Sequence, residues 1–213
     1  MWLNNLKILE SVFLKDKVVR YEDWFERNPL LLDAEVEAIR QLVPDFENGI
    51  EIGVGTGIFA SRLGIFDGVE PSSEMRAIAE DRGIRVIPAK AEKMPIPDKE
   101  YQLALMVTVD CFLDDIPKAF AEARRILKDK GSFVIAFLDK ATTLGELYQA
   151  NKQQNEFYHD ATFHSSAEII GMLVQAGFKI TGMKQTIFSL DNDVQNIEDG
   201  IGDGLFAVIC AVK

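Results

Sequence analysis

The sequence predicts an α/β fold in which a mostly parallel sheet is covered by helices on both faces. From residue 49 onward, short apolar segments alternate with amphipathic helical patterns, as expected when helices connect parallel strands. The first segment, residues 50–54, runs into the glycine-dense turn Gly53-Val54-Gly55-Thr56-Gly57. In α/β proteins, a turn of this kind between a strand and a helix binds a nucleoside-containing ligand.

Two helices are expected before the sheet, over residues 3–27 and 33–43, because apolar residues recur there at helical spacing. Asp33 is a suitable N-cap for the second helix, and Pro44 follows its end. We assign residues 1–45 to an N-terminal helical cap that lies outside the sheet.

The central elements follow from the alternation of apolar strands with amphipathic helices. They are expected as strand 50–54, helix 58–63, strand 68–70, helix 73–82, strands 84–88 and 101–109, helix 117–128 and strand 132–138. Residues 49–138 thus form the predicted ligand-binding core.

A polar stretch over residues 142–161 follows the core and is expected as an insert. Ser165 and Glu168 then form a capping-box pattern that opens a helix, and Gly177 should end it.

Two closing strands are expected over residues 178–188 and 205–212. The length of 213 residues suits one α/β domain that buries about 70% of its unfolded surface. We therefore predict a single domain over residues 1–213, with residues 165–213 as its C-terminal helix and strands.

Composition narrows the class of protein. The net charge is −11 and no basic run occurs, so we expect no nucleic-acid partner. No apolar run reaches the about 18 residues that span a bilayer, and the N-terminus lacks the basic segment and cleavage site of a signal peptide. Two cysteines do not make a disulfide framework. These observations favour a cytoplasmic protein.

The glycine spacing bears on the ligand. A dinucleotide fingerprint, G-x-G-x-x-G/A, would place a small residue where Ile58 stands. A Walker A loop would need a lysine after its glycines, and none follows here. NAD, FAD and nucleoside triphosphates are therefore disfavoured.

The same loop resembles motif I of the class I S-adenosylmethionine-dependent methyltransferases, a strand followed by acidic-x-G-x-G-x-G. Glu51, Gly53, Gly55 and Gly57 match it.

Three further segments resemble motifs of this family in the family's order. Glu70 matches the acidic residue that ends the second strand, residues 89–98 are similar to "G-D-A-E-x-L-P-F-x-D", and residues 119–131 are similar to the helix and turn containing "E-x-x-R-V-L-K-P-G-G". The resemblance covers residues 49–138 and is closest to the ubiquinone and menaquinone biosynthesis type, which acts on small molecules.

The resemblance implies a Rossmann-like methyltransferase fold, with a seven-stranded sheet whose last strand is antiparallel. It also implies S-adenosylmethionine as the cofactor, lying across the carboxyl ends of strands one, two and four, and S-adenosylhomocysteine as the product. In this family the insert, residues 142–161, forms a lid over the substrate.

The resemblance also implies the cofactor-binding residues. The glycine loop should face the methionine moiety, Glu70 the ribose hydroxyls, Glu51 the loop or the cofactor ammonium, and Ala91 and Glu92 the adenine. The full set is Glu51, Gly53, Val54, Gly55, Gly57, Glu70, Pro71, Ala91, Glu92, Val107 and Thr108. The sequence departs from the family at Lys90, where an aspartate is usual.

A general base is needed only if the acceptor is protonated. Asp110 and Tyr21 are the preferred catalytic candidates, and the other candidates are Asp114, Asp115, His159 and His164.

We expect no metal site, because the two histidines are five residues apart and no acidic or cysteine cluster accompanies them. Cys111 follows the fourth strand as a nucleophilic cysteine does in cytosine methyltransferases. It lacks the preceding proline, so we interpret Cys111 and Cys210 as buried thiols.

The predicted function is methyl transfer to an O, N or C nucleophile of a small molecule. The acidic residues Asp110, Asp114 and Asp115 favour the hypothesis that this molecule is a small amine. The alternatives are an NAD-dependent oxidoreductase and a catalytically silent regulatory module that binds S-adenosylmethionine. The oligomeric state, monomer or homodimer, stays open.

Overall fold

A computed structural model describes residues 15–155 and 157–213. Most of the first predicted helix is observed, and its portion over residues 3–14 lies outside the described residues.

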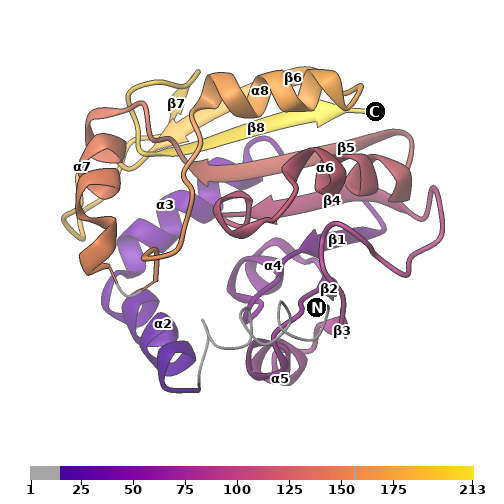
Figure 1. Cartoon of the computed structure of the whole chain (residues 1–213), viewed down its shortest axis with the longest axis horizontal. Coiled ribbons are helices and arrows are strands. Elements are labelled where there is room, and N and C mark those ends of the chain that lie inside the picture. The colour runs from indigo at the N-terminus through magenta and orange to yellow at the C-terminus, as the bar shows by residue number, and fades with distance from the viewer. Residues whose placement is uncertain (1–14, 156) are drawn as a thin grey trace.

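The centre of the molecule is one sheet with the strand order β3-β2-β1-β4-β5-β8-β6-β7 (Figure 1). Strands β1 to β5 are mutually parallel, and β8 is antiparallel to both of its neighbours. The antiparallel last strand is therefore confirmed. The strands are β1 (Gly49–Ile52), β2 (Asp67–Val69), β3 (Arg85–Ile87), β4 (Tyr101–Val107), β5 (Leu127–Leu138), β6 (Lys179–Thr186), β7 (Glu198–Asp199) and β8 (Phe206–Val212).

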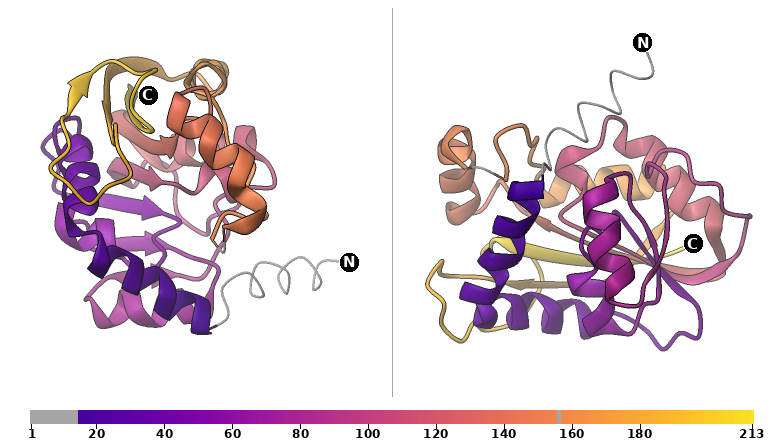
Figure 2. Two further views of the ribbon diagram at one scale, coloured as in Figure 1. Left: turned by 90° about the vertical axis from the view of Figure 1, so that its left-hand side faces the viewer. Right: turned by 90° about the horizontal axis from the view of Figure 1, so that it is seen from below.

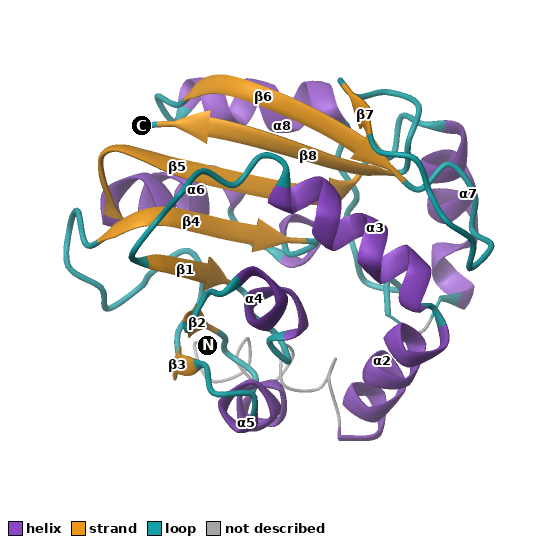
Figure 3. Ribbon diagram, turned by 180° about the vertical axis from the view of Figure 1, so that it is seen from behind, coloured by secondary structure: helices purple, strands orange, loops and turns teal. Residues whose placement is uncertain are grey.

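Helices cover both faces of the sheet, with α6 and α8 on one face and α3 and α4 on the other (Figures 1 and 3). The helices are α2 (Lys15–Arg27), α3 (Pro29–Arg40), α4 (Ile58–Leu63), α5 (Ser73–Asp81), α6 (Ile116–Ile126), α7 (Thr143–Asn151) and α8 (Ser166–Gln175), with the 3-10 turns η1 (Asp110–Phe112) and η2 (Lys152–Gln154).

The side-chain alternation of β4 shows how the two layers are built. Leu103 and Leu105 pack with the α3 and α4 layer, whereas Ala104 and Met106 pack with the α6 and α8 layer. All four are fully buried, because both faces of a parallel sheet are covered by helices.

The helices α2 and α7 lie beyond the carboxyl ends of the parallel strands, and all the ribbon views show them there (Figures 1, 2 and 3). At that edge α2 packs against α3 and α5. The carboxyl edge is therefore enclosed by elements that lie outside the αβ alternation.

Several boundaries differ from the expected ones, and two of them have a clear local cause. Helix α3 begins at Pro29, so Asp33 lies inside it and is not its cap. A proline at the first helical position has its φ already set for the helix, which explains the earlier start. Helix α6 ends at Ile126, two residues early, because Leu127 already pairs with Tyr101 of β4.

The predicted insert contains a helix that its polar composition hides. Helix α7 begins after Thr142, whose hydroxyl accepts a hydrogen bond from the Gly145 N–H at 3.0 Å. The capping box of Ser165 and Glu168 at the start of α8 is confirmed. Strand β7 has only two residues and was not expected.

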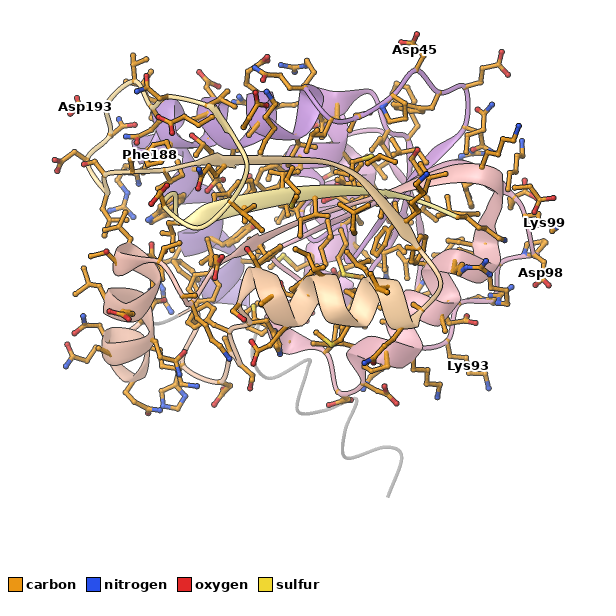
Figure 4. All side chains as sticks on the ribbon, turned by 90° about the horizontal axis from the view of Figure 1, so that it is seen from above. Asp45, Lys93, Asp98, Lys99, Phe188 and Asp193 are labelled. Carbon is orange, nitrogen blue, oxygen red and sulfur yellow. The ribbon has the colours of Figure 1, made fainter. Side chains whose placement is uncertain are left out.

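Charged side chains project outward around the rim of the molecule, as Figure 4 shows for Asp45, Lys93, Asp98 and Lys99. Within the two described ranges, no helix has both the length and the apolar character needed to cross a membrane.

Candidate functional site

The glycine loop connects β1 to α4 in a backbone conformation that glycine favours. Gly53, Gly55 and Gly57 have φ angles of +74°, +54° and +80°. A Cβ on Gly53 would lie 2.4 Å from the side chain of Val109, whereas a Cβ on Gly55 would meet no atom within 4 Å. Gly55 thus exposes its backbone to an open space, and that space is the first of two cavities at the carboxyl edge of the sheet.

Glu70, at the end of β2, ties the glycine loop to the start of α5. Its Oε2 accepts a hydrogen bond from the Gly55 N–H at 3.0 Å, and its Oε1 accepts one from the Ser72 N–H at 2.9 Å. The side chain is buried and lines the cavity. Burial raises the pKa of Glu70, although the two backbone N–H groups oppose that shift. Each oxygen keeps a lone pair for a further donor.

Glu51 lies in β1 beneath the loop and does not line the cavity. Burial raises the pKa of Glu51 well above its ordinary value, while a backbone hydrogen bond from Ala60 opposes the shift. Its Oε2 has no hydrogen-bond partner among the described residues. This orphaned buried atom is able to receive a donor from a ligand or a water.

The first cavity brings together most of the residues that the motifs predict. Eight line it, namely Gly53, Gly55, Glu70, Pro71, Ala91, Glu92, Val107 and Thr108. Glu51, Val54 and Gly57 do not. Val54 packs in the core, and Gly57 is the N-cap residue of α4.

Two groups of lining residues were not predicted. Ser72 and Met75 stand in the segment that follows Glu70, and the family pattern quoted for that segment includes a serine and a methionine, so a signal existed for them. Phe112, Phe157 and Tyr158 come from outside the motifs, and no local pattern marks them.

The wall opposite the glycine loop contains the position at which the sequence departs from the family. The Lys90 Nζ lies 2.9 Å from Asp114 Oδ2, and Glu92 Oε1 accepts a hydrogen bond from the Asp114 N–H at 3.0 Å. All three residues line the cavity. Lys90 therefore compensates a nearby carboxylate and joins two segments of the wall.

Thr108, directly after β4, has a φ of +51°, which is an unusual conformation for a β-branched residue. Its N–H donates to the Ala136 carbonyl at 2.8 Å, and this bond to β5 holds the strained backbone in place. Thr108 lines both cavities.

The second cavity, which we call the aromatic chamber, is enclosed mainly by α2, α3 and the segment around α7. Four residues line both it and the first cavity: Tyr21, Thr108, Phe157 and Tyr158. The other lining residues are Trp24, Phe25, Asn28, Leu31, Glu35, Phe59, Leu138, Tyr148, Asn155, Ile187, Leu190 and Leu205.

The aromatic rings of the chamber contact one another edge to face. The Tyr21 ring lies 5.0 Å from that of Phe25 and 6.0 Å from that of Phe157, between centroids. Burial and four nearby carboxylates raise the pKa of the Tyr21 phenol far above its ordinary value. At neutral pH the Tyr21 hydroxyl is therefore a hydrogen-bond donor and not an ionised base.

Of the predicted acidic candidates Asp110, Asp114 and Asp115, only Asp114 lines one of the two cavities. The Asp110 carboxylate is buried and lies 3.0 Å from His164 Nδ1, and it lines neither cavity. Asp115 caps α6, and the exposed His159 pairs with its neighbour Asp160. Asp110 therefore anchors the segment before α8 to η1, and does not open toward the substrate as expected.

Glu35 is the functional candidate that sequence reasoning missed. It is the one acidic residue among those lining the chamber. The signal was present, because Glu35 lies four residues after Leu31 and four before Ile39, on the buried face of α3. An acidic residue on the apolar face of a predicted helix is therefore a signal that identifies Glu35 as a candidate from the sequence.

The two cysteines are buried free thiols, and burial raises the pKa of each. Across the described part of the chain, no group of three or more His, Cys, Asp or Glu side chains is placed to hold a metal ion.

Comparison with known proteins identifies the family. The methyltransferase domain model matches residues 50–135. An uncharacterized protein of Methanocaldococcus jannaschii is 42% identical over 195 residues, which cover 91% of this chain and 95% of that protein. An uncharacterized protein of Mycobacterium tuberculosis is 34% identical over 202 residues, which cover 90% of this chain and 70% of that protein.

Among solved structures, a Thermotoga maritima protein described as a "SAM-dependent methyltransferase, possible histamine N-methyltransferase" has a TM-score of 0.91 and 38% identity, covering 95% of this chain and 99% of that one. The cofactor of this fold is S-adenosylmethionine, with S-adenosylhomocysteine as product. The chain belongs to the class I S-adenosylmethionine-dependent methyltransferases.

Proposed function

We propose that the chain transfers a methyl group from S-adenosylmethionine to a nucleophilic nitrogen of a small molecule that binds in the aromatic chamber. The observation that carries this proposal is the junction of the two cavities. Because Tyr21, Thr108, Phe157 and Tyr158 line both, the two cavities adjoin, and we propose that a ligand in one meets a ligand in the other there.

The residues of the first cavity fit the cofactor. Gly55 presents a backbone that no side chain covers, and Glu70 keeps two lone pairs for a vicinal diol. We propose that the glycine loop holds the methionine moiety and Glu70 the ribose. Ala91 and Glu92 would then border the adenine. When bound, S-adenosylmethionine supplies a methyl group that is already activated on a sulfonium.

Since the methyl group is activated, the main task of the chain is orientation, which contributes about 7–11 kcal/mol in well-aligned reactions. The N-terminal helices supply Tyr21 to the junction, and the insert supplies Phe157 and Tyr158. We propose that these rings exclude water there and that the Tyr21 hydroxyl donates a hydrogen bond to the acceptor. On this proposal, residues 142–161 are the wall and lid of the acceptor site.

Two observations support a nitrogen nucleophile: the negative net charge of the chain and its similarity to a protein of Thermotoga maritima. The net charge of −11 favours neutral or cationic substrates over anionic ones. The Thermotoga maritima relative, whose description mentions a possible histamine N-methyltransferase, is 38% identical over nearly the whole chain. The family model and the relatives named above give no support to a dinucleotide-dependent oxidoreductase.

A methyl-transfer screen tests the proposed function. Labelled S-adenosylmethionine is incubated with the protein and with small amines, heteroaromatic amines, phenols and carboxylic acids, and the products are identified by mass spectrometry. We expect N-methylated products. Products from phenols or carboxylic acids alone would remove the nitrogen class, and binding of S-adenosylhomocysteine without turnover of any acceptor would favour the silent regulatory module.

A matched pair of glycine variants tests the role of the loop. Gly55 and Gly64 both have positive φ angles, and a Cβ on either would meet no atom within 4 Å, but only Gly55 lines the cofactor cavity. Both G55A and G64A should lose about 1–2 kcal/mol of stability from the left-handed backbone. Only G55A should bind S-adenosylhomocysteine at least about tenfold more weakly by titration calorimetry. Equal affinities of the two variants would contradict the assigned role.

A further inference from the structure

The aromatic chamber contains one carboxylate, and no described residue forms a hydrogen bond or an ion pair with it. Asn28, Leu31 and Glu35 lie at spacings of three and four residues, so α3 presents all three to the chamber. Glu35 is only 8% exposed. Burial alone shifts its pKa, because no hydrogen bond and no charged group of the described residues contributes.

An unpaired carboxylate at such a position is costly to keep ionised. Burial raises the pKa of Glu35 to about 8. The titratable groups that face it are phenols, Tyr21 of α2, Tyr148 of α7 and Tyr158 of the insert. Among the described residues that line the chamber, none carries a positive charge. A cation that entered the chamber would therefore be the first partner for this acid.

The surrounding rings favour the same kind of ligand. Tyr21, Trp24 and Tyr148 line the chamber together with Glu35. The face of an aromatic ring attracts a cation, and a carboxylate beside such rings adds a charged hydrogen-bond acceptor. The rings and the carboxylate together are therefore the groups that would bind an ammonium ion.

Glu35 lies away from the place at which the methyl group would be transferred. Glu35 lines the chamber but not the cofactor cavity, whereas the methyl group must enter at the junction marked by Tyr21, Thr108 and Phe157. An acceptor that spans the chamber thus has its reacting nitrogen at the junction and its other end at Glu35.

We propose that Glu35 binds a cationic ammonium group of the acceptor, at the end of the molecule remote from the nitrogen that is methylated. The acceptor class is then a small aromatic or heteroaromatic molecule with an aminoalkyl side chain. This inference rests on the proposed function, because it takes the chamber as the acceptor site.

Titration calorimetry on the full chain saturated with S-adenosylhomocysteine tests the proposal. The probes are three pairs in which a hydroxyl replaces the ammonium group: histamine and 4-(2-hydroxyethyl)imidazole, 2-phenylethylamine and 2-phenylethanol, and tryptamine and tryptophol. The wild type should bind the ammonium member of at least one pair about tenfold or more tightly than its alcohol. Glu35→Gln should remove this preference while keeping the affinity for S-adenosylhomocysteine and a melting temperature no lower than that of the wild type. Glu37→Gln, on the exposed face of the same helix, is the matched control and should keep the preference.

A second measurement detects the proton that Glu35 loses. Because burial raises the pKa of Glu35, an ammonium ligand that pairs with it at pH 7 should release a proton, measured from the binding heat in buffers of different ionisation enthalpy, and Glu35→Gln should release none. 2-Phenylethanol and tryptophol, which have no group that titrates near this pH, should release none.

Three results would overturn the proposal: no preference for the ammonium member in any pair, a preference that survives Glu35→Gln, or a proton release on ammonium binding that survives Glu35→Gln. Failure of S-adenosylhomocysteine to bind would instead count against the proposed function, so the two failures are distinguishable.

Discussion

Replacing Glu70 by alanine should weaken the binding of S-adenosylhomocysteine about a hundredfold. On our assignment the carboxylate accepts two hydrogen bonds from the ribose. A hydrogen bond to a charged group contributes at least about 1.5 kcal/mol, and each 1.4 kcal/mol is a factor of ten in affinity. Glu70→Gln keeps one acceptor oxygen and should lose at least about tenfold.

Two readouts separate this effect from a loss of structure, since Glu70 also accepts hydrogen bonds from Gly55 and Ser72. Thermal unfolding should show that Glu70→Gln is folded, and titration calorimetry should then give its affinity. Glu74→Gln, a partly exposed acid four residues later in the first turn of α5, is the control and should bind within about twofold of the wild type. An unchanged dissociation constant in Glu70→Ala would contradict the assignment.

The second large effect concerns stability and pH. The pKa of Glu35 rises from 4.5, the ordinary carboxyl value, to about 8 in the folded chain. Between these values the folded state binds more protons than the unfolded state, so stability is present at low pH and is lost as pH rises through this window. As pH rises from 5 to 9, the ionisation of this one group should lower the free energy of unfolding by about 3–4 kcal/mol.

Glu35→Gln removes that titration, so its stability should exceed that of the wild type at pH 9 and approach it at pH 5. Urea unfolding at the two pH values measures the difference. Burial also raises the pKa of Glu51, Glu70 and Asp110, so the wild type alone does not isolate Glu35, whereas the comparison with the variant does. Equal pH dependence of the wild type and Glu35→Gln would show that Glu35 ionises normally.

The cofactor side of the site could be predicted from the sequence because its determinants are local. The glycine loop needs residues that tolerate positive φ within a few positions of a buried strand, and Glu70 ends the next strand. Both features are contiguous in the chain, and the structure places Gly53, Gly55 and Glu70 around one cavity.

The acceptor side could not be predicted in this way because it forms only when distant segments pack together. Tyr21 and Glu35 come from the consecutive helices α2 and α3, but Tyr148 comes from α7, far along the chain, and no spacing links the three. The aspartates that suggested an amine substrate are engaged elsewhere: Asp110 faces His164 and Asp114 pairs with Lys90. Local pattern showed that acids follow β4, but only tertiary packing decides which acid meets the chamber.

Titration calorimetry of the wild-type chain with S-adenosylhomocysteine and with NAD is the most direct test of the central claim, that the cavity beside the glycine loop holds the methyl donor. We expect S-adenosylhomocysteine to bind at one site per chain and to stabilise the fold by about 2.7 kcal/mol at a hundred times its dissociation constant, with no binding of NAD. Binding of NAD without binding of S-adenosylhomocysteine would contradict this account of the site.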